Sequence, residues 1–559
     1  MLNKLDLSTF RGDLTGGITA AVVALPMALT FGVASGAGAE AGLYGAIIIG
    51  LFAALFGGTP TLISEPTGPM TVVMTAVITT MMAKNPENGM AMAFTVVMVA
   101  GAFQMLMGAL KLGRYITLMP YSVISGFMSG IGLILIIIQI GPMLGQSAPS
   151  GGAVSTITSL PDLISAISTT ELGLALIALA ILFFYPKQLK RYLPPQLFAL
   201  ILLSIVSVIL FDSDELRRIG EINVGIPSVN LPYFTPEQVT EIILDGIVLG
   251  MLGCIDSMLT SVIADNLTRT EHNSNKELVG QGIGNIVSGL LGGLPGAGAT
   301  MGTVVNIQAG GRTHLSGVIR ALILIVVVYG LAFLIAHIPL AVLAAIAVKV
   351  GVDILDWSFI KRAHRISWQT TGIMYAVMFL TVTVDLIVAV GAGIFVANII
   401  IIEKLRIAQQ DNIKAISDVD DATPLSREER KLLNASNGQI LLVYLSGPMI
   451  FAMSKTLSKQ SSSIKKQRFV ILDLSDVPMM DDTMLLAIEN TINDLKGKNK
   501  EIYLVVNDQS LKDKLERIGT IELIGASAIV ETRKAALESA NLLLTKSTDA
   551  PPLEASVSQ

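Results

Sequence analysis

An aspartate in the middle of an apolar run is the residue with the clearest chemistry in this sequence. Asp256 lies within DGIVLGMLGCIDSMLTSVIAD, and Thr260 follows four residues later, which places both side chains on one face of a helix. An ionised carboxylate in hydrocarbon costs free energy unless it is paired, so this residue marks a functional site. A carboxylate, a hydroxyl and nearby carbonyl oxygens suit Na⁺. A carboxyl that carries protons and a structural buried aspartate are the alternatives.

Two strings interrupted by glycine and proline resemble each other across the chain. SEPTGPMTVVM begins at Ser64 and GAGATMGTVVNI begins at Gly296, so that Thr71 aligns with Thr303 at a spacing of 232 residues. In transporters, paired interrupted segments of this kind indicate a binding site near the middle of the bilayer. We therefore expect two half-helices, one after each break.

The starts of these half-helices suit an anion. The first turn of a helix leaves backbone N–H groups without partners and carries the positive end of the helix dipole. Pro66 and Pro69 fit a helix start because their fixed φ and missing N–H cost nothing there. Two such ends that face each other attract an anion. Flexible loops or packing glycines are the alternative explanation of the two strings.

Composition indicates a membrane protein and excludes several other classes. Of 559 residues, 52% are hydrophobic and 14% are charged, and the mean hydropathy is +0.67. A net charge of −5 offers no basic excess to bind nucleic acid. The single cysteine, Cys254, excludes an intramolecular disulfide, and four histidines suggest no metal cluster. We find no nucleophile–base set and no phosphate-binding loop in the sequence, so it gives no indication of an enzyme or of a bound cofactor.

About fourteen uncharged or nearly uncharged runs follow one another between residues 14 and 402. Several are shorter than the roughly 20 residues that a helix needs to cross the hydrocarbon, so some are expected to be half-helices. Lys4 and Arg11 precede the first run, so the positive-inside rule places the N-terminus in the cytoplasm. The sequence predicts a polytopic α-helical membrane protein of about fourteen segments, arranged as two inverted halves of seven.

A soluble domain is expected after the membrane part. From Gly438 onward, strand patterns such as ILLVYL and RFVILDLS alternate with helical patterns such as MLLAIENTINDLK, which predicts a small α/β domain with a mixed or parallel sheet. The expected divisions are a cytoplasmic N-terminus (1–13), a transmembrane domain (14–402), a charged linker (403–437), the soluble domain (438–545) and a disordered tail (546–559).

These features together resemble the SulP family of anion transporters, called SLC26 in animals, over nearly the whole chain. The strings that carry the resemblance are LPMALTFG, GPMTVV, SVISGFMSGIGLIL, GCIDSMLTSVIAD, PGAGATMGTVVNIQAGGRTHLSG and DLIVAVGAGIFVAN. The C-terminal domain resembles a STAS domain. The resemblance implies a seven-plus-seven inverted repeat divided into a core and a gate, a homodimer, and elevator-like movement of the core.

Within the family, TLISEPTGPMTVVMTAVI and RTEHNSNKELVGQGIGN resemble the sodium-dependent bicarbonate transporters of cyanobacteria. This resemblance implies Na⁺:HCO₃⁻ symport into a bacterium across its plasma (inner) membrane, with the STAS domain in the cytoplasm. The sodium ion would be held by Asp256, Thr260, Thr300 and the carbonyls of Gly298 and Gly302. Bicarbonate would lie between the two half-helix starts, near Thr67, Ala299 and Met301. Phe31 lines the pocket or packs beside it.

One departure from the wider family supports that subgroup. Many SulP members carry an arginine just before the TVVN-like string, where this chain has Gly302. An anion without that fixed charge needs another, and a sodium ion at Asp256 would supply it. Glu65 remains a further candidate for the site. Arg320, which stands in an apolar run, is expected to snorkel or to pair near the membrane surface.

Other functions stay open at the level of sequence. Proton-coupled transport of sulfate or a dicarboxylate is the second transporter hypothesis. A membrane sensor or scaffold that acts through the STAS domain and its regulatory partners belongs to a different class. In DLSDVPMMDDTMLLA, Thr483 matches the position at which STAS domains are phosphorylated, although a structural helix cap is the favoured explanation of this stretch.

Overall fold

The computed structural model describes the chain except for residues 1, 4–6, 117–119, 150, 187, 190–192, 213–214, 222–224, 226, 385, 409–412, 418–424, 451–452, 455, 458–463, 465 and 549–559. The chain forms two compact units, Met1–Ala397 and Asn398–Gln559. The predicted tail 546–559 falls largely outside the described residues.

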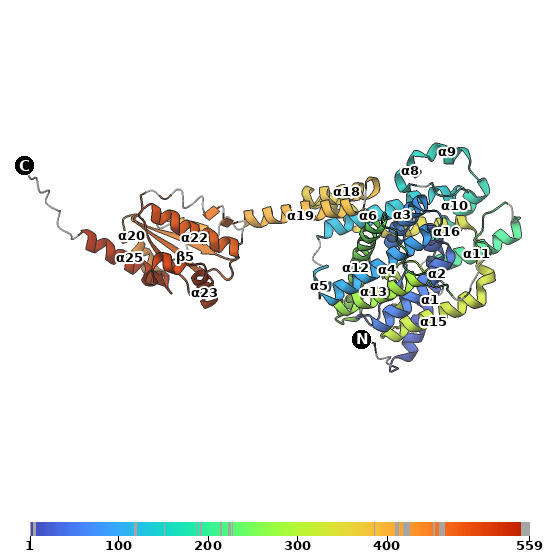
Figure 1. Cartoon of the computed structure of the whole chain (residues 1–559), viewed down its shortest axis with the longest axis horizontal. Coiled ribbons are helices and arrows are strands. Elements are labelled where there is room, and N and C mark those ends of the chain that lie inside the picture. Colours follow the sequence, from blue (N-terminus) through green and yellow to red (C-terminus); the bar gives the residue numbers. More distant parts are fainter. Residues whose placement is uncertain are drawn as a thin grey trace, which may run out of the picture. The chain divides into compact units, whose positions relative to one another are not determined.

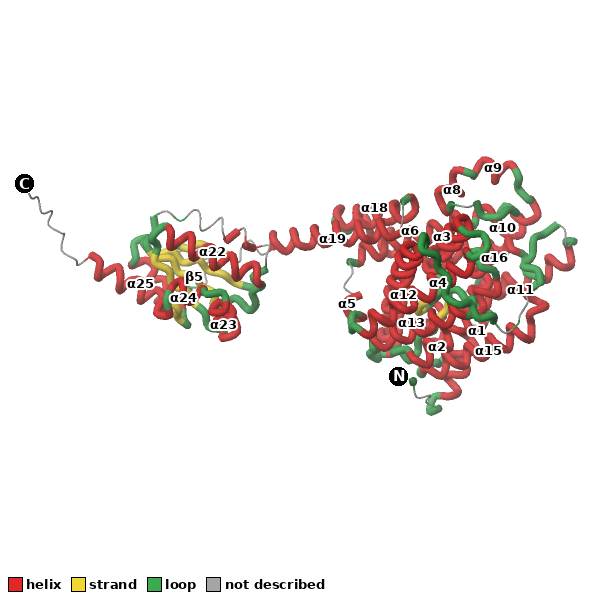
Figure 2. Tube along the Cα trace, viewed as in Figure 1, coloured by secondary structure: helices red, strands yellow, loops and turns green. Residues whose placement is uncertain are grey.

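The first unit is built from helices, with one very short pair of strands among them (Figures 1 and 2). Among the described residues, six helices are long and apolar enough to cross a membrane, and shorter apolar helices accompany them. The main helices are α1 (Phe10–Ser35), α2 (Ala39–Phe56), α3 (Gly68–Lys84), α4 (Gly89–Ala109), α6 (Tyr121–Ile138), α10 (Thr169–Phe184), α11 (Pro195–Leu210), α12 (Val239–Thr268), α13 (Ser274–Leu290), α14 (Thr300–Gln308), α15 (His314–Ile335), α16 (Leu340–Ile354) and α18 (Trp368–Thr383). The boundary between the two units falls within α19 (Leu386–Ala408).

The two breaks predicted from the sequence are present. After α2, the chain forms the two-residue strand β1 (Ser64–Glu65) and then starts the short helix α3, with Pro69 in its first turn. After α13, the chain forms β2 (Ala297–Gly298) and starts α14, which is nine residues long. Both helices are shorter than a full span, as expected for half-helices.

Close helix crossings hold these elements together. α13 packs against α4 and α2, and α12 packs against α4 (Figure 1). α4 and α13 meet at Gly101 and Gly282: a Cβ atom built on Gly101 would lie 2.6 Å from the carbonyl oxygen of Gly282, and the reverse distance is 2.5 Å. Only glycine allows this approach, which is how helices pack in a membrane without a hydrophobic driving force.

Arg320 corrects one expectation from the sequence. Its side chain is fully buried (0% exposed), so it does not snorkel to a surface. It pairs with the buried carboxylate of Glu65 and donates hydrogen bonds from Nη1 to the carbonyls of Ala46 and Ser64, each at 3.1 Å. The pair ties α15 to β1, immediately beside the first break.

The second unit contains a five-stranded sheet in the order β3-β4-β5-β6-β7, flanked by helices (Figure 2). The strands are β3 (Ile413–Ile416), β4 (Ile440–Ser446), β5 (Phe469–Asp476), β6 (Glu501–Val505) and β7 (Ile529–Val530). β3 is antiparallel to β4, and the remaining pairs are parallel, which confirms a mixed sheet. Alternate residues of β4 enter two apolar clusters, one on each face of the sheet.

The expected linker 403–437 proves to contain folded elements of this unit. β3 forms the edge of the sheet, and α20 (Arg427–Ala435) packs on α25 (Arg533–Thr548). Asn541 donates to the carbonyl of Leu432 at 2.9 Å, and Leu433 is fully buried. The sequence did not predict β3 and α20, because each buries only a few side chains and so lacks a continuous pattern of apolar residues.

Three further helices lie along the parallel strands: α22 (Asp482–Gly497), α23 (Gln509–Arg517) and α24 (Thr520–Ile524). Asp481 caps α22, accepting a hydrogen bond from the backbone N–H of Met484 at 2.8 Å. Thr483 therefore lies in the first turn of α22, where it is exposed. The helix cap expected near Thr483 is therefore formed by Asp481.

Candidate functional site

The two short strands bring the interrupted segments together. β1 and β2 are antiparallel, with Ser64 opposite Gly298 and Glu65 opposite Ala297. The N–H of Ala299 donates to the carbonyl of Ile63 at 2.8 Å. Each helix starts just after its strand, so the antiparallel pairing makes the two chains leave in opposite directions. The N-terminal ends of α3 and α14 therefore follow opposite ends of one two-residue ladder, which brings the two breaks together as the repeat predicts.

Oxygen atoms from α12 and from the second break gather at this point. The Thr260 hydroxyl donates to the carbonyl of Gly298 at 2.8 Å and lies 3.0 Å from the hydroxyl of Thr300. One helical turn earlier on α12, the Ser257 hydroxyl accepts from the N–H of Gly298 at 3.1 Å. Thr260 thus lies within hydrogen-bonding distance of two other predicted sodium ligands, Gly298 and Thr300.

Asp256 lies on the same helix beside this group and is almost fully buried (8% exposed). The Thr67 hydroxyl is next to its carboxylate. Within the described part of the chain, neither Oδ2 of Asp256 nor Oγ1 of Thr67 has a hydrogen-bond partner. Buried polar atoms are normally paired, so two neighbouring orphans indicate a place for a polar ligand.

Gly302 has a different position from the other predicted sodium ligands. It lies inside the first turn of α14, where helix geometry directs a carbonyl along the helix toward its C-terminus. A Cβ atom on Gly302 would lie 3.1 Å from Cγ2 of Ile63 and 3.2 Å from Oε1 of Glu65. The structure therefore gives Gly302 the role of a close contact with β1 and the Glu65–Arg320 pair.

The predicted anion-site residues surround the two helix starts in different ways. Thr67 is the N-cap residue of α3, and Ala299 is the N-cap residue of α14; both are 8% exposed. Met301, in the first turn of α14, is 40% exposed. Phe31 of α1 is 1% exposed, which shows that it is tightly packed.

Sequence reasoning missed several residues that shape the site. Ser257 binds the N–H of Gly298, and the Thr303 hydroxyl accepts from the N–H of Ile63 at 3.0 Å. Asn285 holds both backbone groups of Gly296. In the sequence, each is a polar residue among apolar or small residues. Its role could not be predicted, because its hydrogen-bond partners are known only from the fold.

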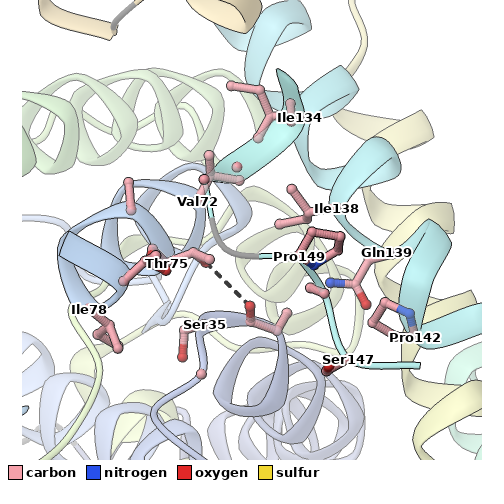
Figure 3. Close-up of a pocket in the computed structure, with 18 of the residues that line it drawn as sticks. Ser35, Val72, Thr75, Ile78, Ile134, Ile138, Gln139, Pro142, Ser147 and Pro149 are labelled. Carbon is pink, nitrogen blue, oxygen red and sulfur yellow. Dashed lines mark hydrogen bonds between the residues drawn. The ribbon is translucent and has the colours of Figure 1, made fainter. Parts of the chain in front are cut away.

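A cavity of about 780 Å³ lies elsewhere in this unit, between α1, α3 and α6 (Figure 3). Ser35, Val72, Thr75, Ile134 and Gln139 line it. Thr75 donates a hydrogen bond to the carbonyl of Ala34 across its wall at 3.3 Å. The lining includes Thr30 and Val72 but does not include Thr67, Phe31 or Asp256.

The described residues contain no group of three or more His, Cys, Asp or Glu side chains that could hold a metal ion. Oxygen atoms on and against α12 are instead the carboxylate of Asp256 and, one helical turn later, the hydroxyls of Thr260 and Thr300 with the carbonyl of Gly298. Hard oxygen ligands of this type suit an alkali cation, and interrupted helices supply them in transporters.

Comparisons with known proteins agree with this architecture. Residues 10–377 match the sulfate permease family, and residues 433–536 match the STAS domain. The chain is 56% identical over 542 residues to the bicarbonate transporter BicA of a Synechocystis strain, covering 97% of this chain and 96% of that protein.

Solved structures show the same folds. The transmembrane domain of a cyanobacterial bicarbonate transporter BicA matches 70% of this chain and 99% of its own length, with 64% identity and a TM-score of 0.67. The overall structure of SLC26A9 covers 98% of this chain and 92% of its own, with a TM-score of 0.80 at 16% identity. The second likeness covers both units of this chain and concerns the fold alone.

Proposed function

We propose that this chain, which belongs to the sulfate permease family of membrane transporters, takes up bicarbonate together with Na⁺. The observation that carries the proposal is the buried carboxylate of Asp256, whose Oδ2 has no hydrogen-bond partner among the described residues and which lies beside Thr67 at the start of α3. The 56% identity to a bicarbonate transporter along 97% of the chain supports bicarbonate as the anion.

In this proposal the sodium ion is bound by the Asp256 carboxylate, the hydroxyls of Thr260 and Thr300 and the carbonyl of Gly298. Thr260 already contacts the Gly298 carbonyl at 2.8 Å and the Thr300 hydroxyl at 3.0 Å, so the ion would replace or join existing contacts without a large rearrangement. The bound ion supplies the positive charge that the glycine at position 302 lacks.

Bicarbonate is placed between the two half-helix starts. Backbone N–H groups in the first turn of each helix have no partner within that helix and donate well to an anion. The Thr67 hydroxyl adds a side-chain donor, and Met301 and Ala299 limit the space on the side of α14. Phe31 supports α1 behind the site by packing. The anion and the cation then stabilise each other's binding, which couples their transport.

The remaining assignments extend this function. We place the N-terminus and the STAS domain in the cytoplasm of a bacterium and the helical unit in its plasma membrane. We further propose a homodimer and elevator-like movement of a core against a gate. The exposed Thr483, in the first turn of α22, is the candidate regulatory site of the STAS domain, and a phosphate there would meet the repulsion of Asp481 and Asp482.

Uptake of ¹⁴C-bicarbonate into vesicles that contain the purified protein tests the coupling directly. We expect uptake to rise at least about tenfold when an inward Na⁺ gradient replaces an equal K⁺ gradient, because the site requires the cation's charge. Vesicles without protein are the control. Equal uptake under both gradients would exclude sodium coupling.

Replacing Thr67 by valine tests the anion site. We expect the KM for bicarbonate to rise about tenfold, the usual effect of losing a hydrogen bond to a charged group, while the amount of protein in the membrane stays the same. Thr67→Ser keeps the hydroxyl and is the matched control. An unchanged KM in Thr67→Val would remove this residue from the site.

Proton-coupled transport of sulfate or a dicarboxylate is the second candidate, because the family match is to sulfate permeases and a buried carboxyl can carry a proton. Competition by sulfate, succinate and fumarate at fixed Na⁺ and varied pH separates the two. Inhibition by these anions, with uptake that follows a pH gradient in the absence of Na⁺, would favour this alternative.

A further inference from the structure

The helix α13 carries a row of polar side chains on one buried face. Glu277, Gln281, Asn285 and Ser288 recur every three or four residues, and none is more than 1% exposed. Polar groups at this depth cost free energy unless each finds hydrogen-bond partners. Their partners therefore show what the row does.

The first half of the row binds the segment between α2 and α3. Glu277 accepts hydrogen bonds from the N–H groups of Gly58 and Thr59, both at 2.8 Å. Gln281 donates to the hydroxyl of Ser64 at 2.6 Å. Since Ser64 begins β1, these two side chains fix the path of the chain into the start of α3.

The second half binds the segment between α13 and α14. Asn285 donates from Nδ2 to the carbonyl of Gly296 and accepts at Oδ1 from the N–H of Gly296, both at 2.9 Å. The side-chain amide thereby pairs with Gly296 as a neighbouring strand would. Ser288 donates to the carbonyl of Leu294 at 2.7 Å.

Gly296 is held from its other side as well. A Cβ atom on this residue would lie only 2.5 Å from the carbonyl oxygen of Glu65 in β1. The glycine is thus enclosed between Asn285 and β1, two residues before Gly298 and three before Ala299. Asn285 therefore holds the backbone only two residues before the Gly298 carbonyl, at the entry to α14.

We propose that α13 is the positioning element of the transport site, with its first half setting the start of α3 and its second half setting the start of α14. Asn285 is the central positioning residue, because only an amide presents a donor and an acceptor side by side to one backbone residue. The binding consequences rest on the proposed bicarbonate and sodium sites.

Kinetics of uptake separate positioning from general stability. In Asn285→Ala, the KM for bicarbonate and the half-saturating Na⁺ concentration both rise about five- to tenfold, and the maximal rate per molecule in the membrane stays within about twofold. In Gln281→Leu, which loosens only the first break, the KM for bicarbonate rises without a comparable change for Na⁺. A maximal rate that falls with both constants unchanged would overturn the proposal.

Val287→Ala is the matched control, because it removes apolar packing from another face of α13. It lowers thermal stability and leaves both constants unchanged. Ser288→Ala is the milder variant of the second half, losing one hydrogen bond; it shifts both constants in the same direction as Asn285→Ala and keeps the test decisive if that variant does not reach the membrane.

Hydrogen–deuterium exchange gives a readout that needs no transport. In Asn285→Ala, the amides of residues 294–300 exchange at least about tenfold faster, whereas those of α2 are unchanged. Unchanged exchange at 294–300 would overturn the positioning role. If wild-type uptake proved independent of Na⁺, the proposed coupling would fail, and the exchange data together with the KM for bicarbonate would still decide the role of α13.

Discussion

Replacing Asp256 by alanine is expected to reduce sodium-dependent bicarbonate uptake at least about 100-fold. The carboxylate is the charged ligand of the proposed sodium site, and removing one member of a buried charge pair typically costs about 3–5 kcal/mol, or a factor of at least 100 in binding. Initial rates of ¹⁴C-bicarbonate uptake, normalised to protein in the membrane, measure the effect.

Asp265 offers a matched control on the same helix. Its carboxylate contacts His272 at 2.6 Å near the end of α12, away from the interrupted segments. Asp265→Asn therefore keeps its sodium dependence. Wild-type sodium dependence in Asp256→Ala would disprove the assignment of the cation. Uptake in the wild type that responds to a pH gradient, and is lost in Asp256→Asn, would indicate that this carboxyl carries protons.

Breaking the Glu65–Arg320 pair is expected to have the largest effect on stability. In Arg320→Met, the Glu65 carboxylate remains fully buried without its partner, which destabilises a protein by about 3–5 kcal/mol. The melting temperature in detergent, followed by fluorescence-detected size-exclusion chromatography, falls accordingly. Glu65→Gln combined with Arg320→Met removes both charges and recovers most of the loss.

The Glu171–Arg217 ion pair provides the comparison for this experiment. The paired atoms are 2.8 Å apart, and the Arg217 side chain is 35% exposed, so water screens the guanidinium that Glu171→Gln would leave behind. Glu171→Gln is therefore expected to lower the melting temperature much less than Arg320→Met. Similar losses in both variants, or no recovery in the double variant, would contradict a special role for the buried pair.

The membrane class and the two breaks could be predicted because their causes are local. A helix in hydrocarbon must be apolar along its length, so fourteen runs of low charge indicate spans without any knowledge of packing. Pro66, Gly296 and Gly298 lie in the two breaks, and Pro69 suits the first turn of α3, each through its own backbone chemistry. The similar strings around Thr71 and Thr303 then show, from the sequence alone, that the two breaks correspond to each other.

The C-terminal domain shows the limit of periodic patterns. Strands buried on both faces, such as β4 and β5, are continuous apolar runs and were predicted correctly. β3 and α20 were assigned to a linker, because four residues of strand and nine of charged helix carry too few apolar positions to indicate folding. Their contacts with β4 and α25 exist only in the folded domain.

By itself, the sequence determined that this is a membrane protein, that helices are interrupted at two matching positions and that an aspartate lies within an apolar span. Tertiary structure alone decided what those features meet. It placed Thr260 and Thr300 around Gly298, set Arg320 against Glu65, and turned the polar face of α13 toward both breaks. The physical reason is that buried polar groups are specified by partners far away in the chain, whereas apolar runs and helix breakers act through their own neighbours.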